Sequence, residues 1–306
     1  MKNKKEETII LGEQTERPRK VLTKKQLRIR FWSVAAVIVV VAVFLGQFVG
    51  NWIVNSYLNT FTFAGDETTL METESTIKKW KNKSIDNMTP VEAFVVAQYN
   101  LENSEKFSLL IEGEILATVG VSVSQSVYSY NYRDGNEFYN EYVSKSSLVE
   151  VATGYRYNYE TQIANTFKGS APDKTTAVWN EYLDLTRDEY KEKAGIYPGQ
   201  CIDYIVSRQT VNQDKCVALQ KQANGNYVFS LSLNNYATVN YTKKMDFVAG
   251  TKAGTFYDIV LNVEVDSNLN FVTINIVEEY TVPKFNATAK ANMTQTFDFV
   301  SEPIKK

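Results

Sequence analysis

The sequence predicts a single transmembrane α-helix followed by a mainly-β (α+β) ectodomain, in which two or three helices cover a large curved antiparallel sheet. Three observations predict this fold class: residues 31–49 carry no ionisable side chain, apolar residues mostly recur at every second position from Phe107 to Val300, and turn sequences divide that region. An apolar run of this length matches a membrane span, and period-two alternation is typical of strands with one buried face. We expect five segments: a basic cytoplasmic tail (1–30), a transmembrane helix (31–50), a stalk (51–89), an extracytoplasmic β-rich domain (90–300) and a C-terminal tail (301–306).

The N-terminal tail is strongly basic. Residues 1–30 hold ten Lys or Arg and four acids, a formal charge of +6 in a 306-residue chain whose net charge is −2. Basic flanks stay in the cytoplasm, so we expect the N-terminus inside and the domain outside. The tail is either a topology determinant that binds anionic lipid of the inner leaflet or a docking peptide for a cytoplasmic partner. No nucleic-acid partner is expected. The basic residues that flank the apolar run are Arg19, Lys20, Lys24, Lys25, Arg28 and Arg30.

The apolar run itself, from Phe31 to Val49, would span roughly 28 Å as an α-helix, close to the hydrocarbon thickness of a bilayer. Trp32 and Trp52 lie near its two ends, where aromatic side chains favour the headgroup level. A secretory signal would have a short basic start and a small-residue cleavage site. A soluble buried helix would have polar positions along one face. The sequence fits neither alternative, so we expect an uncleaved single-pass anchor in the cell membrane.

Capping boxes indicate two helices in the outer part of the chain. Residues 89–92 read Thr-Pro-Val-Glu and begin an apolar pattern that runs to about Asn103. Residues 186–189 read Thr-Arg-Asp-Glu, and Gly195 is a suitable stop for the helix that they begin. A weaker pattern from Asp66 to Trp80 indicates a third helix within the stalk.

Turn chemistry separates the predicted strands. Residues 134–136, 224–226 and 266–268 combine Asp, Asn, Gly and Ser between alternating runs, as hairpins require. Between Val121 and Tyr132 the apolar alternation changes phase, which predicts a bulge or a sharp twist. The segment Ile202–Lys215 is predicted to be a strand and a turn. We therefore interpret residues 90–300 as one domain.

Cys201 and Cys216 are the only cysteines, and both fall in the part expected outside the membrane. In an oxidising compartment such a pair indicates a disulfide, which would stabilise the domain by about 3 kcal/mol. The alternative is a pair of free, buried thiols. A metal site at these two residues lacks further soft ligands nearby.

The absence of histidine excludes several kinds of chemistry. A Ser-His-Asp site, a Cys-His site and a His-ligated zinc site all need a residue that this chain does not contain. Glu278 and Glu279 are adjacent on a predicted strand, so their side chains point to opposite faces, and we expect two surface carboxylates. We expect no cofactor, no metal and no catalytic residue. An enzyme would have to work with carboxylates, Lys, Ser or Tyr alone.

The order helix, long meander, short helix, second meander resembles the half-barrel cradle of lipoprotein-carrier and mycobacterial lipid-binding proteins, the LolA and LppX type. The last third carries most of the likeness: strand 256–265, turn 266–268, strand 271–280 ending in Glu279-Tyr280, and a return strand 293–299. The resemblance covers about 90–300 and implies a lipid-binding protein of the cell envelope. A permanent anchor is a departure from those families, and it argues against shuttling between membranes.

Two functions remain open at this point. The first is a tethered cradle that holds an apolar ligand, such as a lipid or a cell-wall precursor, against the aromatic-rich face of the sheet. The cradle hypothesis requires this face to be too broad for its helices to cover. If the helices do cover it, the face is simply the packed core. The second is a non-catalytic assembly or sensor subunit with an envelope protein as its partner.

Overall fold

The computed structural model describes residues 63 and 65–305, apart from 148, 251–252 and 284–285. The chain divides into two units, Met1–Ile53 and Val54–Lys306. The predicted membrane segment lies outside the described residues, together with Trp32, Trp52 and the six basic residues before the segment. Among the residues that are described, no helix is both long and apolar enough to cross a membrane.

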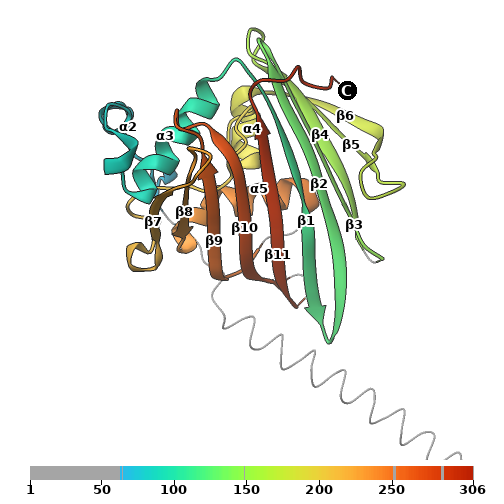
Figure 1. Cartoon of the computed structure of the whole chain (residues 1–306). Helices are drawn as coiled ribbons and strands as arrows, with labels where there is room; N and C mark the ends of the chain where they lie inside the picture. Colours follow the sequence, from blue (N-terminus) through green and yellow to red (C-terminus); the bar gives the residue numbers. More distant parts are fainter. Residues whose placement is uncertain (1–62, 64, 148, 251–252, 284–285, 306) are drawn as a thin grey trace, which may run out of the picture. The chain divides into compact units, whose positions relative to one another are not determined.

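The second unit is built on one sheet of eleven strands in the order β6-β5-β4-β3-β2-β1-β11-β10-β9-β8-β7. Every neighbouring pair is antiparallel. Figure 1 shows the sheet curling around helices on one side. The predicted large curved antiparallel sheet is therefore confirmed. The strands are β1 (Lys106–Val119), β2 (Val121–Asp134), β3 (Glu137–Lys145), β4 (Glu150–Asn158), β5 (Ile163–Ser170), β6 (Val178–Thr186), β7 (Val217–Lys221), β8 (Tyr227–Ser232), β9 (Phe256–Val265), β10 (Phe271–Val282) and β11 (Ala287–Asp298).

Four α-helices accompany the sheet in the described part of the chain: α2 (Glu74–Lys81), α3 (Pro90–Asn103), α4 (Arg187–Ala194) and α5 (Val239–Ala249). Both predicted capping boxes are present. The Thr89 and Thr186 hydroxyls accept from the backbone N–H three residues on, and the glutamates there accept in return. Gly195 ends α4 at φ +80°, a left-handed conformation that glycine adopts without strain.

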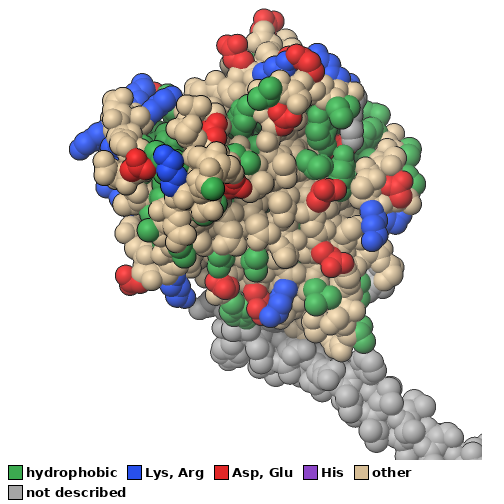
Figure 2. Space-filling model, in the orientation of Figure 1, with side chains coloured by type: hydrophobic (Ala, Val, Ile, Leu, Met, Phe, Trp, Pro, Cys, Tyr) green, Lys and Arg blue, Asp and Glu red, His purple; other side chains and the backbone are tan. Residues whose placement is uncertain are grey.

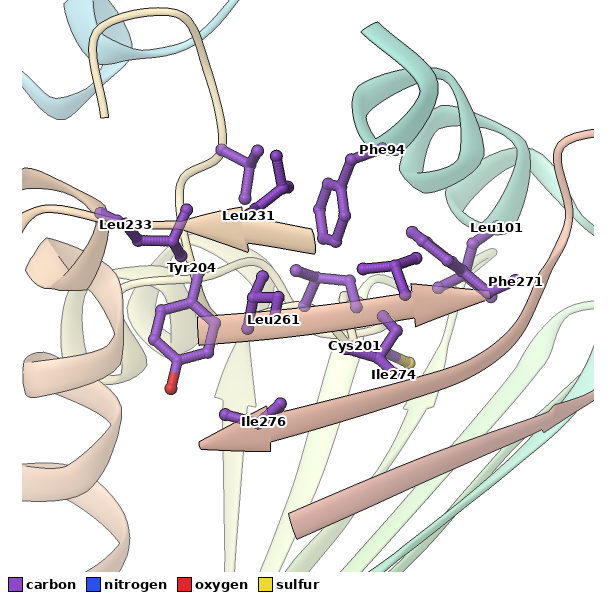
Figure 3. Packing of buried hydrophobic residues seen from close by; sticks show 14 of the residues in the cluster. Phe94, Leu101, Cys201, Tyr204, Leu231, Leu233, Leu261, Phe271, Ile274 and Ile276 are labelled. Carbon is purple, nitrogen blue, oxygen red and sulfur yellow. The ribbon is translucent and has the colours of Figure 1, made fainter. Parts of the chain in front are cut away.

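The main core lies between α3 and the C-terminal half of the sheet. Figure 3 shows Phe94 and Leu101 of α3 directed at Leu231, Leu261 and Phe271. Phe94 is fully buried, and its ring centroid lies 5.1 Å from that of Phe271. Burying a large apolar side chain contributes about 1.5–3 kcal/mol, so this layer supplies much of the stability of the domain.

Residues 51–89 were predicted to be a stalk, and from residue 65 onward this prediction is wrong. There the segment forms short helical turns and α2, and it packs on the domain. Trp80 is buried, Glu72 accepts from the Arg208 guanidinium at 2.8 Å, and Glu67 pairs with Lys191 at 2.8 Å. The apolar contacts of this segment are far apart in sequence, so they leave only the weak pattern from Asp66 to Trp80, of which α2 is the helical part, and this explains the error.

Three smaller expectations also changed. Helix α5 was not predicted, because it lacks a side-chain N-cap and buries only Asn240 fully. The segment Ile202–Lys215 is mostly a loop with one short 3-10 turn, Gln213–Lys215, rather than a strand. The register between β1 and β2 is unbroken, so the phase change before Tyr132 is not a bulge. Both faces of β2 are covered toward its end, which removes the alternation.

Candidate functional site

A groove of about 970 Å³ opens between the β5–β6 edge of the sheet and helices α4 and α5. We call it the edge groove. Its volume lies within the range typical of small-molecule sites. Its walls combine aromatic and aliphatic groups with charged ones. The lining residues are Phe63, Thr166, Phe167, Lys168, Glu181, Tyr182, Leu183, Glu192, Lys193, Val239, Thr242, Lys243, Asp246, Phe247 and Ala253.

The apolar part of the edge groove is open to solvent. Leu183 is 55% exposed, although a strand beside two helices would ordinarily bury the side chains on its helix-facing side. Phe247 comes from α5, and the Lys168 ammonium lies 5.7 Å from its ring centroid. The groove is therefore an apolar surface that the chain itself leaves uncovered.

The charges around the edge groove are balanced. Three lysines and three acids line it, and Lys243 reaches Glu67 at 3.4 Å. Lys168 and Glu181 are direct cross-strand neighbours in the β5–β6 pairing. A site with an apolar wall and charges of both signs suits a molecule with an apolar body and a polar end.

The strand pairings connect the groove residues Lys168 and Glu181 to the rest of the helix-facing side of the sheet. Because cross-strand partners share a face, the pairings place one row of residues side by side. This row changes from apolar at β10 to polar at the groove. In strand order it reads Ile274, Gln295, Ile111, Ser129, Tyr142, Thr153, Lys168 and Glu181.

Polar side chains on this side of β2–β5 bond to one another. Asn140 donates to the Asn131 amide oxygen at 2.6 Å, Asn131 donates to the Ser129 hydroxyl at 3.3 Å, and Thr166 donates to the Leu183 carbonyl at 2.8 Å. Buried polar groups need such partners, because each unpaired group costs about 1–3 kcal/mol.

The opposite face of β2–β5 carries an aromatic cluster of its own. Tyr130, Tyr132, Tyr139 and Phe167 form a separate buried cluster, with the rings of Tyr132 and Tyr139 stacked at 5.4 Å. The C-terminal segment is bonded to this cluster: the Ile304 N–H donates to the Tyr130 hydroxyl at 2.9 Å. Figure 2, which views the sheet from the side opposite α4 and α5, shows hydrophobic side chains gathered toward the β2–β4 region.

A buried carboxyl joins the sheet to α5. Glu278 of β10 is 1% exposed, and its two oxygens accept from the Tyr204 hydroxyl and from the Tyr241 hydroxyl, the latter at 2.9 Å. Tyr204 lies in the loop after α4, and Figure 3 shows its hydroxyl directed away from the apolar cluster. Burial raises the pKa of Glu278 to about 7, the phenol hydrogen bonds oppose the rise, and the nearby Asp203 carboxylate adds to it.

Glu278 corrects the expectation of two surface carboxylates. Glu279 does point the other way and pairs with Lys290 at 2.9 Å, as the opposite-face argument requires. Glu278, however, follows Ile274 and Ile276 on the apolar face and precedes Tyr280 there, all at every second position. That period-two pattern was the signal that could have identified a buried acid.

The two cysteines are free thiols in the structure, so the predicted disulfide is not formed in it. Cys201 is buried in the main core, and burial raises the pKa of its thiol. Cys216 is half-buried and donates to the Asn212 carbonyl at 3.5 Å. Over the described residues, no group of three Cys, Asp or Glu side chains is placed to hold a metal ion.

No residue of the edge groove was predicted from the sequence. Its side chains come from β5, β6, α4, α5, the segment before α2 and the loop before β9, so only the fold brings them together. The nearest signal for the groove in the sequence was the weak apolar alternation of the strand that carries the exposed Leu183 and Tyr182.

Comparison with known proteins was made by family model, by sequence and by structure. No family model matches the chain, and no curated protein matches it. Solved structures do match. The architecture resembles that of the LolA superfamily. A LolA superfamily protein from Nitrosomonas europaea matches at 9% identity and a TM-score of 0.23, over 71% of this chain and 96% of that one.

Two further solved structures give similar values. A putative outer membrane lipoprotein-sorting protein domain from Vibrio parahaemolyticus matches at 10% identity and a TM-score of 0.27, over 69% of this chain and 93% of that one. The ywiB protein from Bacillus subtilis matches at 9% identity and a TM-score of 0.19, over 64% and 94%. These likenesses concern architecture alone, so we argue function from the side chains of this chain.

Proposed function

We propose that the domain is a membrane-tethered, extracytoplasmic binding protein whose edge groove holds an amphipathic, lipid-like ligand. The observation that carries this proposal is the open apolar wall of the groove, where Leu183 of β6 remains exposed in the same lining as Phe247 of α5. Covering such a surface is favourable by about 25 cal/mol for each Å² of apolar area removed from water.

In this proposal the apolar body of the ligand lies along Leu183, Val239 and Phe247, and its polar end meets the charged rim. Lys168 and Lys193 supply ammonium donors there, and Glu181 supplies a carboxylate acceptor. The main core does not take part, because α3 already fills it with Phe94 and Leu101. The proposal assigns no catalytic step to the site.

A matched pair of substitutions tests this function. Leu183 lines the groove and Tyr257 lies on β9, away from the groove lining, and both are 55% exposed. The full chain in lipid nanodiscs would be titrated with a fluorescent fatty acid, with empty nanodiscs subtracted. We expect Leu183→Gln to weaken binding about fivefold, from the loss of about 1 kcal/mol of apolar contact, and Tyr257→Gln to leave it unchanged. Equal affinities for both variants and the unsubstituted chain would contradict the proposal.

The tether in this proposal is the apolar run within residues 31–50, with the basic tail inside and the domain outside. The charge difference across the run supports this orientation. An arginine at mid-membrane costs about 2.5–3.5 kcal/mol on insertion scales, so Val40→Arg should impair insertion. Protease added to intact cells should remove the outer domain and leave a small membrane-bound fragment. A soluble mature protein that starts near residue 50 would show a cleaved signal instead.

One observation favours a second candidate, an assembly or sensor subunit. β6 is a terminal strand of the sheet, and most of its residues are exposed, including Val178, Tyr182 and Leu183. Exposed edge strands pair readily with a strand of another protein. A stoichiometric partner recovered from membranes, and lost when Asn180 is replaced by Pro, would favour this function over ligand binding.

A further inference from the structure

Glu278 stands where three parts of the domain meet, and nothing in the ligand-binding proposal uses it. It belongs to β10, the Tyr204 hydroxyl that it accepts from belongs to the loop after α4, and the Tyr241 hydroxyl belongs to α5. The ring centroids of Tyr204 and Tyr241 lie 5.1 Å apart. The buried Glu278 carboxyl therefore connects both the loop after α4 and helix α5 to the sheet by hydrogen bonds.

Helix α5 is also a wall of the edge groove. Val239, Thr242, Lys243, Asp246 and Phe247 line the groove from the helix that carries Tyr241. Any change in how tightly α5 is held to β10 therefore changes the width of the groove.

We propose that Glu278 is a pH-sensitive latch of the edge groove, whose ionisation loosens α5 from the sheet and opens the groove. The proposal rests on the edge groove being a ligand site. It concerns the regulation of that site rather than the identity of its ligand.

The charged and titratable groups around the carboxyl leave it without a cation of its own. The groups that face it are Tyr204 and Asp203 of the loop, Tyr241 of α5, Tyr142 of β3 and Tyr280 of its own strand. The neighbouring ammonium, Lys244 of α5, is held by both oxygens of Asp203 at 2.8 and 2.9 Å. Across the described residues, Glu278 forms no ion pair with a lysine or an arginine.

The direction of the switch follows from this environment. A carboxylate buried without a cation is costly, and the cost disappears when water reaches it. The pKa of Glu278 is about 7 in the closed domain and takes its ordinary value of 4.5 when the carboxyl is hydrated. Ionisation therefore favours the open arrangement, so raising the pH through about 7 opens the groove and releases its ligand, while the proton passes to solvent.

Hydrogen exchange on the ligand-free full chain in nanodiscs tests the latch directly. After correction for intrinsic exchange, we expect the protection of α5 amides to fall about tenfold between pH 6 and pH 8, the change that pKa values of 7 and 4.5 imply. Glu278→Gln should hold this protection constant with pH. Glu279→Gln, on the opposite face of the same strand, should behave as the unsubstituted chain does.

The proposal is overturned if α5 protection in the unsubstituted chain does not depend on pH, or if Glu278→Gln keeps the dependence. Should Glu278→Gln fail to fold, Tyr241→Phe takes its place. It removes one donor to the carboxylate, so the midpoint of the transition should move to higher pH, and an unmoved midpoint contradicts the latch.

A second arm separates failure of the latch from failure of the binding function. Retention of the fluorescent fatty acid should be about tenfold weaker at pH 8 than at pH 6, and equal at both in Glu278→Gln. No binding at any pH, together with pH-dependent α5 protection, would refute the ligand site and leave the latch standing. Binding that is equal at both pH values would refute the coupling between them.

Discussion

The helix-facing side of the sheet is apolar along β8–β11 and mixed along β2–β5, where Phe138, Tyr155 and Tyr157 belong to the main core beside polar side chains. In the first half, Leu231, Leu261 and Ile274 pack under α3. In the second half the same side also carries hydrogen-bonded Ser129, Asn131 and Asn140, while Tyr130, Tyr132 and Tyr139 lie on the opposite face. The half under α3 behaves as a core that stabilises the fold. The mixed half is covered only in part by apolar packing, and the edge groove opens at its β5–β6 edge, where Leu183 stays exposed.

The largest expected effect comes from the core half. Phe94→Ala should lower the free energy of unfolding by about 3–5 kcal/mol, because a fully buried ring leaves a cavity that its neighbours cannot close. Urea unfolding of the full chain in detergent, followed by tryptophan fluorescence, measures the change. Leu183→Ala, at the exposed groove, should cost less than about 0.5 kcal/mol. Similar costs at both sites would remove the distinction between the halves.

Glu278 of β10 should make the stability of the domain depend on pH. Its pKa in the folded domain, about 7, lies above the ordinary 4.5, so its stabilising contribution is complete below pH 4.5 and is lost as the pH rises to 7. We expect unfolding free energy to fall by about 3 kcal/mol more in the unsubstituted chain than in Glu278→Gln over this range. Parallel pH profiles would contradict a buried, protonated Glu278.

The cluster of Tyr130, Tyr132, Tyr139 and Phe167 should depend on the C-terminal segment. Tyr130→Phe removes the acceptor of the Ile304 N–H, and we expect a loss of about 1 kcal/mol, the usual net value of one hydrogen bond. Thermal unfolding should show the change. An unaltered midpoint would mean that this segment does not contribute to covering the cluster.

The smallest effect is expected at the end of the same segment. Lys305 pairs with Asp134 at 2.6 Å, and both side chains are partly or largely in solvent. Exposed ion pairs contribute about 0–1 kcal/mol, so Lys305→Gln should change stability by less than Tyr130→Phe does. A larger loss than that of Tyr130→Phe would show that the segment is held by charge rather than by the backbone contact.

The elements with strong local signals were predicted correctly from the sequence. The capping boxes at Thr89 and Thr186 define α3 and α4, and the turns at residues 134–136, 224–226 and 266–268 each join two strands of the sheet. These features depend on a few neighbouring residues, so sequence alone can reveal them.

The elements that depend on distant contacts were not predicted. Helix α5 has a β-branched, weakly amphipathic sequence, and only Gly250 in a left-handed C-cap marks its end. Residues 65–89 are folded because Trp80 and Glu72 find partners far along the chain. The edge groove is assembled from six separate segments, so no local sequence pattern predicts it. Glu278 is the exception, because its position in the alternating apolar pattern of its strand could be recognised in the sequence.

The most direct test of the central claim is to ask what lies in the edge groove in the native membrane. A benzophenone side chain would replace Leu183 in one full-length variant and Tyr257 in another, followed by irradiation of membranes and mass spectrometry of the protein. We predict a lipid-like adduct at position 183 and none at position 257. The account is contradicted by equal labelling at both positions, or by no small-molecule adduct at position 183 in folded protein.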